Sequence, residues 1–208
     1  CRSAEGGFQM KNMVKLGFIM AIYATVACVS LAFVYAGTQK VIAERQKADL
    51  EAALKDLFPQ GEAFEEVTGT LQNSDSSISF KNEYVIKQGG APIGMAVRAV
   101  GASYGGPVTV LVGVGTDGKI AGVKVLENKD TPGLGANAAN PSYFVDRASG
   151  ITFYGQFKGK SLSDPFEVKG DVIAITASTI TSKAVTRVVK TAGQAAGTWL
   201  AAQTGGSK

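Results

Sequence analysis

The sequence contains no histidine, and it contains only two cysteines, Cys1 and Cys28. Histidine is the most common general base and the most common metal ligand, so its absence excludes Ser–His–Asp and Cys–His catalytic triads. Cys28 lies inside an apolar run far from Cys1, and the two cysteines therefore predict no Cys/His metal site. We expect no catalytic side chain and no metal ligand in this chain, so any redox chemistry would require an organic cofactor.

Charge is missing from one long stretch, because no charged residue lies between Lys15 and Lys40. As a helix, residues 16–39 would be about 36 Å long at about 1.5 Å per residue, enough to cross a bilayer core of about 30 Å. Tyr35 lies near one end of this run, where interfacial aromatic residues are common. We therefore predict a transmembrane helix over residues 16–39.

Two other interpretations of this apolar run fit less well. A cleaved signal peptide would have a shorter apolar core of about 7–15 residues. The segment Thr25–Cys28, with Lys11 and Lys15 upstream, is a near match to a lipoprotein signal, but the chain continues upstream of Cys28. We expect a retained single-pass anchor, whose orientation the Lys/Arg count does not determine because basic residues lie on both sides.

The remainder of the chain lacks an excess of charge of either sign. The chain has a net charge of +4, and residues 1–40 contain four basic side chains and one acidic side chain. The other residues, with 17 basic and 16 acidic side chains, have a net charge of +1. Nucleic-acid-binding domains have a clustered basic face, so we expect no nucleic-acid partner.

Hydrophobic periodicity predicts the elements after the anchor. Apolar residues recur at helical spacing over residues 41–58, which predicts a stalk helix that continues the membrane helix and ends before Pro59. Residues 61–77 are polar and mixed. Valine-rich segments joined by Gln88–Gly90 and by Gly115–Gly118 then predict antiparallel strands. The expected strands are residues 83–87, 92–100, 107–114 and 119–127.

The second half of the domain is less regular. We expect a short helix over residues 142–147, strands over 166–168 and 171–175, and a final helix over 182–203 with Ser182 as its N-cap. These elements predict an α+β fold, in which an antiparallel sheet packs against helices. The expected organisation is an N-terminal segment (1–15), a transmembrane helix (16–39), a helical stalk (40–59) and a domain (60–208).

The segment Asp171–Ser182 passes from an apolar stretch, through several hydroxyl side chains, into the final predicted helix. Free N–H groups and the positive end of the helix dipole make such a position an anion site. A threonine there, such as Thr179, can hold a phosphate or be esterified to one.

Two motifs, in order, resemble the covalent FMN-binding domain family, whose members contain Glu-Thr-Pro-Gly-Leu-Gly and then Ser-Gly-Ala-Thr-x-Thr-Ser. The first corresponds to Asp130–Gly135 and the second to Thr176–Ser182, with Ala177 and Ser178 in place of the family's Gly and Ala. The family's acidic residue six positions before the modified threonine falls at Ile173, and Asp171 lies two residues earlier.

The rest of the chain strengthens this resemblance. The lead-in Tyr104–Val110 is similar to the family, and one membrane helix followed by a stalk and this domain resembles the RnfG subunits of Rnf complexes. Those complexes are ion-pumping ferredoxin:NAD⁺ oxidoreductases. The resemblance covers about residues 14–203 and implies an electron-carrying subunit with its domain on the extracytoplasmic side of the inner (cytoplasmic) membrane. It also implies partners in the same complex, namely integral membrane subunits and iron–sulfur or flavin subunits.

The resemblance further implies an FMN joined through its phosphate to the side-chain oxygen of Thr179 by a separate flavin transferase that uses FAD. Lys183 can add a charge-assisted contact to the phosphate. Pro132 stiffens the first motif, its glycines let backbone approach a flat ring, and Leu134 can lie against that ring. The implied FMN contacts, besides Thr179, are Thr176, Ser178, Ile180, Thr181, Ser182, Lys183, Thr131, Pro132, Gly133, Leu134 and Gly135.

Two alternatives stay open at this point. The chain could instead carry out the same chemistry elsewhere, as an NqrC-type subunit of a sodium-pumping NADH:quinone reductase, although that subunit is usually longer, or as a stand-alone flavin reductase. It could also be a membrane-tethered assembly or binding protein in which Thr179 is unmodified.

Overall fold

The computed structural model describes residues 2–67 and 69–205 of the 208-residue chain, and the side chains of residues 12–67 and 69–203. The chain divides into two compact units, residues 1–48 and residues 49–208. Cys1 and residues 206–208, which belong to the first and last predicted segments, lie outside the described residues.

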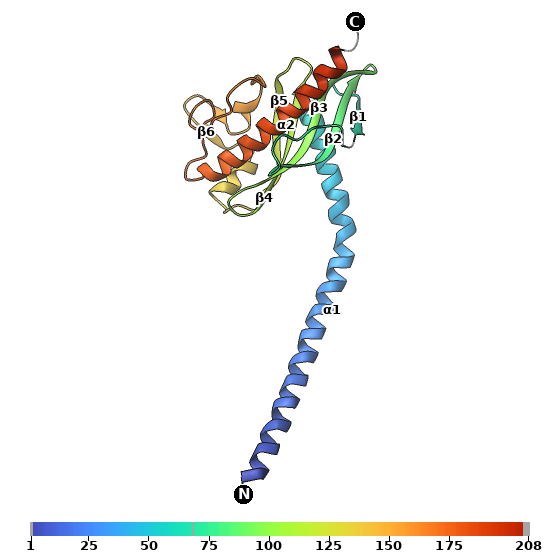
Figure 1. Cartoon of the computed structure of the whole chain (residues 1–208), viewed down its shortest axis with the longest axis vertical. Coiled ribbons are helices and arrows are strands. Elements are labelled where there is room, and N and C mark those ends of the chain that lie inside the picture. Colours follow the sequence, from blue (N-terminus) through green and yellow to red (C-terminus); the bar gives the residue numbers. More distant parts are fainter. Residues whose placement is uncertain (1, 68, 206–208) are drawn as a thin grey trace. The chain divides into compact units, whose positions relative to one another are not determined.

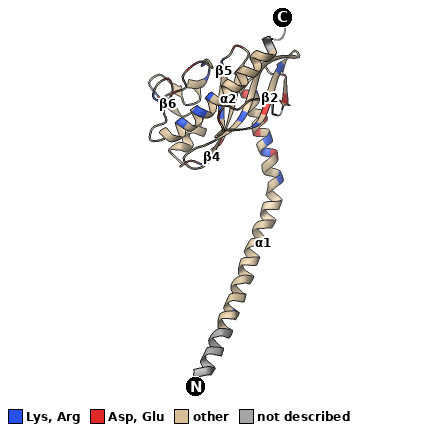
Figure 2. Cartoon of the chain, viewed as in Figure 1, with Lys and Arg blue, Asp and Glu red and all other residues tan. Residues whose placement is uncertain are grey.

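The first unit is helical. Helix α1 (Arg2–Leu57) passes through the predicted membrane span and the predicted stalk, and it ends before Pro59. Among the described residues, one helix is long and apolar enough to cross a membrane, and it lies within α1. Large apolar side chains along it are exposed, with Phe18 at 69% and Phe33 at 76%. Figure 2 shows that Lys, Arg, Asp and Glu return only in the last part of α1, so the exposed surface of the apolar part suits lipid.

The second unit is built on a five-stranded antiparallel sheet in the order β1-β2-β3-β4-β5. Gly89 and Gly90 have positive φ angles in the turn between β2 and β3, and Gly118 has one in the turn between β4 and β5. Short glycine turns join antiparallel neighbours, so four predicted strands are confirmed. The strands are β1 (Ala63–Val67), β2 (Ser79–Gln88), β3 (Ala91–Ala102), β4 (Pro107–Gly115) and β5 (Ile120–Glu127).

The two faces of the sheet are covered by different helices. Because side chains alternate along a strand, Met95 and Val97 of β3 lie on one face and Ala96 lies on the other. The first face packs against helix α2 (Thr179–Gly205), which Figure 1 shows lying across the sheet. The second face packs against the end of α1 and Phe58. Helices on an antiparallel sheet confirm the predicted α+β class.

Glycines make the second face flat enough for close packing. Phe58 lies over Gly94 and Gly113, where an added Cβ would come within 2.5 Å and 2.9 Å of its ring. Leu57 lies over Gly122, where an added Cβ would be 2.7 Å from its Cδ2 atom. The last residues of α1 therefore belong to the core of the second unit.

The segment before α2 differs from its predicted elements. The helix expected over 142–147 is wrong, because β6 (Phe144–Asp146) pairs there with β7 (Ile151–Thr152). Two short 3₁₀ helices, η1 (Gly135–Ala139) and η2 (Gly155–Phe157), lie on either side of this pair. Strand β1 was not predicted, because most of its residues are exposed or half-buried and only its pairing with β2 makes it a strand.

The strands expected over 166–168 and 171–175 are also wrong. The Asp171 carboxylate accepts hydrogen bonds from the backbone N–H of Phe166 (3.2 Å) and of Glu167 (2.6 Å), and it pairs with Lys160 (2.8 Å). These bonds close the segment into a loop. Asp171 therefore stabilises the approach to α2.

The start of α2 lies three residues before its predicted position. The N–H of Ser182 donates to the carbonyl of Ser178 (3.0 Å), so Ser178 directly precedes the helix. The Ser182 hydroxyl donates to the same carbonyl (2.9 Å) and accepts from the N–H of Ile175 (2.9 Å). The buried Ser182 hydroxyl therefore links the loop to the first turn of α2. The prediction that Ser182 caps the helix is wrong.

Candidate functional site

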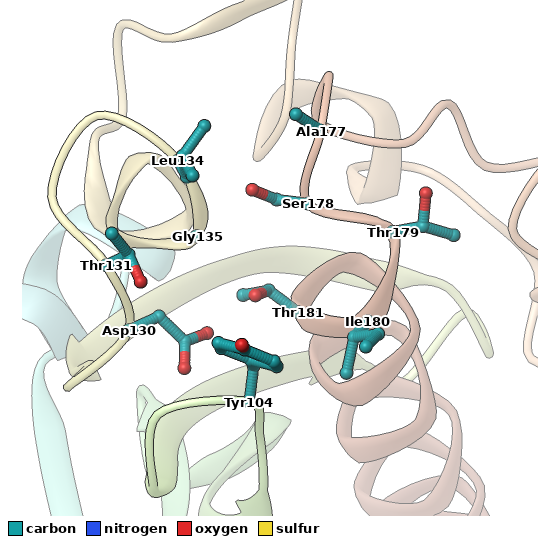
Figure 3. A pocket seen from close by; sticks show the side chains of 10 residues that line it. All are labelled: Tyr104, Asp130, Thr131, Leu134, Gly135, Ala177, Ser178, Thr179, Ile180 and Thr181. Atoms are coloured by element: carbon teal, nitrogen blue, oxygen red, sulfur yellow. The ribbon is translucent and has the colours of Figure 1, made fainter.

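A hollow of about 490 Å³ lies where α2 begins, next to two loops at one end of the sheet (Figure 3). Its volume falls in the range of about 300–1,000 Å³ that is usual for cofactor sites. Three segments far apart in the sequence form its walls. The lining residues are Tyr104, Asp130, Thr131, Leu134, Gly135, Ala177, Ser178, Thr179, Ile180 and Thr181.

The first wall is the start of α2. The first intrahelical bond is donated by Ser182, so the N–H groups of Thr179, Ile180 and Thr181 precede the hydrogen-bond ladder of the helix. Figure 3 shows Ser178 and Thr181 pointing toward the Thr131–Gly135 loop, whereas Thr179 points away from that loop. Thr179 is half-buried, lines the hollow and is the first residue of α2, where the positive end of the helix dipole lies.

The conformation of Ala177 sets this wall. Its φ angle is +58°, in the left-handed region that side chains other than glycine rarely adopt. Ala177 occupies the position of the glycine in the attachment motif that the sequence resembles. The backbone therefore follows the turn for which glycine is suited, although the side chain here is a methyl group.

The second wall is the Thr131–Gly135 loop. The Thr131 carbonyl accepts hydrogen bonds from the N–H groups of Leu134 and Ala136 (both 3.1 Å), which close a tight turn. Gly133 has a φ angle of +77° in this turn. A Cβ at Gly135 would be 2.5 Å from the Thr181 hydroxyl oxygen, so only glycine lets this loop approach α2 so closely.

The third wall is the turn between β3 and β4, and Asp130 joins it to the other two. The Asp130 carboxylate accepts hydrogen bonds from the Ser103 hydroxyl (2.6 Å) and the Gly105 N–H (2.5 Å). It also accepts one from the Thr181 hydroxyl. A single carboxylate therefore ties the β3–β4 turn, the loop and the first turn of α2 together.

Asp130 is ionised despite being only 5% exposed. Burial alone would raise its pKa, but the hydrogen bonds from Ser103, Thr181 and Gly105 favour the charged form. Together they hold the pKa of Asp130 below its ordinary value. The base of the hollow therefore carries a negative charge at neutral pH.

The rim of the hollow is apolar and exposed. Tyr104 is 71% exposed, Ile180 is 59% exposed and Leu134 is 42% exposed, and all three line the hollow. Large apolar side chains gathered around a hollow are typical of a ligand or partner site. A flat ring in the hollow would remove part of this surface from water.

The structure brings seven of the twelve predicted site residues to this hollow. They are Thr131, Leu134, Gly135, Ser178, Thr179, Ile180 and Thr181. Pro132, Gly133 and Thr176 are exposed and lie close in sequence to lining residues, but they do not line the hollow themselves. Ser182 is buried beneath the helix start. Lys183 lines a neighbouring hollow of about 380 Å³ together with Arg187.

Three lining residues were not predicted. Tyr104 and Ala177 stood inside the quoted motifs, and Asp130 opened the first motif, but none had a predicted contact. The signal that could have pointed to Asp130 was its carboxylate, which directly precedes a glycine-containing loop. A carboxylate is costly to bury unless hydrogen-bond donors surround it. Those donors come from distant segments, so the sequence alone did not reveal them.

Comparison with known proteins identifies the family. Residues 103–194 match the model of the FMN-binding domain, and residues 8–57 match the model of the RnfG N-terminal region. Over 192 residues the chain is 33% identical to the G subunit of the Na⁺-translocating ferredoxin:NAD⁺ oxidoreductase complex of Acetobacterium woodii. This match covers 85% of the chain and 87% of the relative. The chain belongs to the RnfG family.

Other RnfG relatives are similarly close. The G subunit of the proton-translocating ferredoxin:NAD⁺ oxidoreductase complex of Clostridium ljungdahlii is 32% identical over 178 residues, covering 83% of this chain and 85% of the relative. The G subunit of the ion-translocating oxidoreductase complex of Methanosarcina acetivorans is 30% identical over 178 residues, covering 84% and 89%. All residues that line the hollow lie inside the matched FMN-binding domain of this RnfG chain.

The hollow suits an FMN group. Its exposed apolar rim matches a flat aromatic ring, and the N–H groups at the start of α2 match a phosphate. The apolar part of α1 and the match to the RnfG N-terminal region together support a membrane-anchored protein.

Proposed function

We propose that this chain is the electron-carrying subunit of an ion-translocating ferredoxin:NAD⁺ oxidoreductase complex, with FMN linked to Thr179 by a phosphoester bond. The observation that carries the proposal is the position of Thr179. Thr179 is a half-buried residue in the first turn of α2, and it lines a hollow together with residues of the Thr131–Gly135 loop. The names of the relatives, which are subunits of such complexes, support the same function.

The chain's own residues would bind and orient the FMN. When bound, FMN supplies one- and two-electron transfer. The backbone N–H groups of Thr179, Ile180 and Thr181 and the helix dipole would stabilise the phosphate charge. Leu134, Tyr104 and Ile180 would cover the ring and exclude water from part of it. The predicted contacts that do not line the hollow would act by shaping its walls or from its edge; these are Thr176, Pro132, Gly133, Ser182 and Lys183.

Attachment requires a second protein. A flavin transferase would join the Thr179 oxygen to the FMN phosphorus of FAD, break the phosphoanhydride bond and release AMP. Figure 3 shows the Thr179 side chain pointing away from the Thr131–Gly135 loop, and such an enzyme would approach the hydroxyl from that side. A covalent bond suits a site on the extracytoplasmic side of the cytoplasmic membrane, where a lost flavin could not easily be replaced. The integral membrane and iron–sulfur or flavin subunits of the complex would be the redox partners.

The test is the mass of the chain produced together with the flavin transferase. We expect an FMN-sized addition on the peptide that contains Thr179, together with flavin fluorescence of the denatured chain in a gel. Thr179→Ala should abolish both signals, whereas Thr179→Ser keeps a hydroxyl and should retain them. Thr198→Ala is the matched control and should keep the FMN, because Thr198 is an exposed threonine of the same helix that does not line the hollow. An unmodified native chain would instead favour a tethering or assembly role.

A further inference from the structure

The ionised carboxylate at the base of the hollow has no neighbouring cation among its described contacts. In the described part of the chain, the groups that contact the Asp130 carboxylate are the Ser103 hydroxyl, the Gly105 N–H and the Thr181 hydroxyl. All three are neutral donors. They favour the charged form of the carboxylate, but they bring no positive charge to cancel it.

Two other hydrogen-bonded aspartates of the domain, Asp171 and Asp75, are placed differently. Asp171 pairs with Lys160 at 2.8 Å, and Asp75 pairs with Arg187 at 2.8 Å. Their charges are therefore compensated by a cation, and neither residue lines the hollow. Asp130 combines burial, a net charge and a place in the wall of the proposed FMN site.

We propose that Asp130 lowers the reduction potential of the FMN, in addition to holding the three walls of the hollow in position. The inference rests on the proposed function. On two-electron reduction at neutral pH the flavin ring takes up two electrons from a partner's cofactor and one proton from water, so it gains one negative charge. A fixed negative charge nearby disfavours that gain. Asp130 thus makes the reduced FMN a stronger electron donor.

The expected effect is large enough to measure. Asp130 is part of the wall, so a ring held in a hollow of this volume lies within about 10 Å of its carboxylate. At an effective dielectric constant of about 20, a unit charge at that distance changes an equilibrium constant by about tenfold or more. For a two-electron couple, tenfold corresponds to about 30 mV.

The experiment is a spectroelectrochemical titration of the full chain in detergent, purified with its FMN attached. Asp130→Asn removes the charge and keeps the shape, so its midpoint potential should lie about 30 mV or more above that of the wild type. Asp130→Glu is the charge-conserving control, and its potential should stay closer to the wild-type value. An unchanged or lower potential in Asp130→Asn would overturn the inference.

Ser103→Ala gives a second test, in which the midpoint potential should change in the opposite direction. This test does not require the Asp130→Asn chain to carry FMN. It removes one donor and leaves the carboxylate charge less compensated, so the potential should fall below that of the wild type. A rise, or no change, would contradict the inference. A merely structural role for Asp130 would lower the melting temperature of both variants without moving their potentials in opposite directions. If the wild type itself carries no FMN, the proposed function fails, which is a separate result.

Discussion

At the residue scale, the backbone at Ala177 is the clearest departure from ordinary geometry near the site. An L residue in the left-handed region costs about 1–2 kcal/mol, and glycine avoids this cost. The same turn leads into Ser178 and Thr179, which both line the hollow. The strain therefore lies directly beside the side chain proposed to hold FMN.

We predict that Ala177→Gly leaves the free energy of unfolding unchanged or raises it by up to about 1 kcal/mol. Relief of the backbone strain offsets the greater flexibility of glycine in the unfolded chain, which costs about 0.5–1 kcal/mol. Ala174→Gly is the matched control, because Ala174 has no positive φ angle and the change should destabilise the domain. Chemical denaturation of the three chains measures the difference. Equal losses in both variants would show that Ala177 is not strained.

At the scale of elements, the end of α1 and the sheet meet through glycines. Phe58 covers Gly94 and Gly113, and Leu57 covers Gly122. Gly113 and Gly122 are direct cross-strand partners, so the small residues lie side by side on neighbouring strands. Any side chain there would lift the helix end from the sheet.

We predict that Gly94→Ala lowers the free energy of unfolding by about 1–3 kcal/mol. The new Cβ would lie 2.6 Å from the carbonyl oxygen of Val114, which is backbone and cannot move aside cheaply. Gly193→Ala is the control, since its Cβ would meet only the side-chain ends of Ile120 and Leu162, at 3.0 Å and 3.1 Å. The gain in helix propensity offsets that contact, so we expect a small change. Thermal unfolding of both variants distinguishes a glycine that faces rigid backbone from one that faces side-chain ends, which can move aside.

The success of prediction also differed among elements. The strands between Ser79 and Glu127 followed from valine-rich runs and glycine turns, which are local signals. The segment 166–175 did not, because one carboxylate, Asp171, draws the N–H groups of Phe166 and Glu167 out of any strand. The start of α2 was misplaced because the Ser182 hydroxyl bonds to Ile175 instead of capping the helix.

At the scale of the whole molecule, the chain consists of an apolar helix and a domain with its own core. The second unit, Asp49–Lys208, contains the sheet, α2 and the last turns of α1 that pack on the sheet. Its two buried clusters involve residues from this unit alone. The unit should fold without residues 1–48.

We predict that residues 49–208, produced alone, form a folded soluble domain, whereas the full chain stays with the membrane fraction after an alkaline carbonate wash. The physical reason is that residues 16–39 expose apolar side chains that only lipid would cover. Fractionation, with a thermal melt of the short chain, measures both properties. Sedimentation of the short chain with membranes would contradict the assignment of the anchor to residues 1–48. A protease added outside spheroplasts should digest the domain if it is extracytoplasmic.

The site shows most clearly what each level of description contributes. The two motifs, their order and the anchor could be recognised in the sequence, because periodicity, turn chemistry and charge are properties of neighbouring residues. The resemblance that these features carry pointed to Thr179 and to the Thr131–Gly135 loop, and the structure places Thr179, Thr131, Leu134 and Gly135 around one hollow. The resemblance left Tyr104 and Asp130 without a role.

The sequence by itself determined the apolar anchor and the antiparallel strands, since these depend on local composition and spacing, and its two motifs carried the resemblance that implies FMN. Only the tertiary structure decided which side chains meet. Packing of α2 across the sheet brings Thr181 to Asp130, and the β3–β4 turn brings Ser103, 27 residues away in the chain, to the same carboxylate. Hydrogen bonds between distant segments form only when the hydrophobic core holds those segments together, so they leave no periodic signal in the sequence.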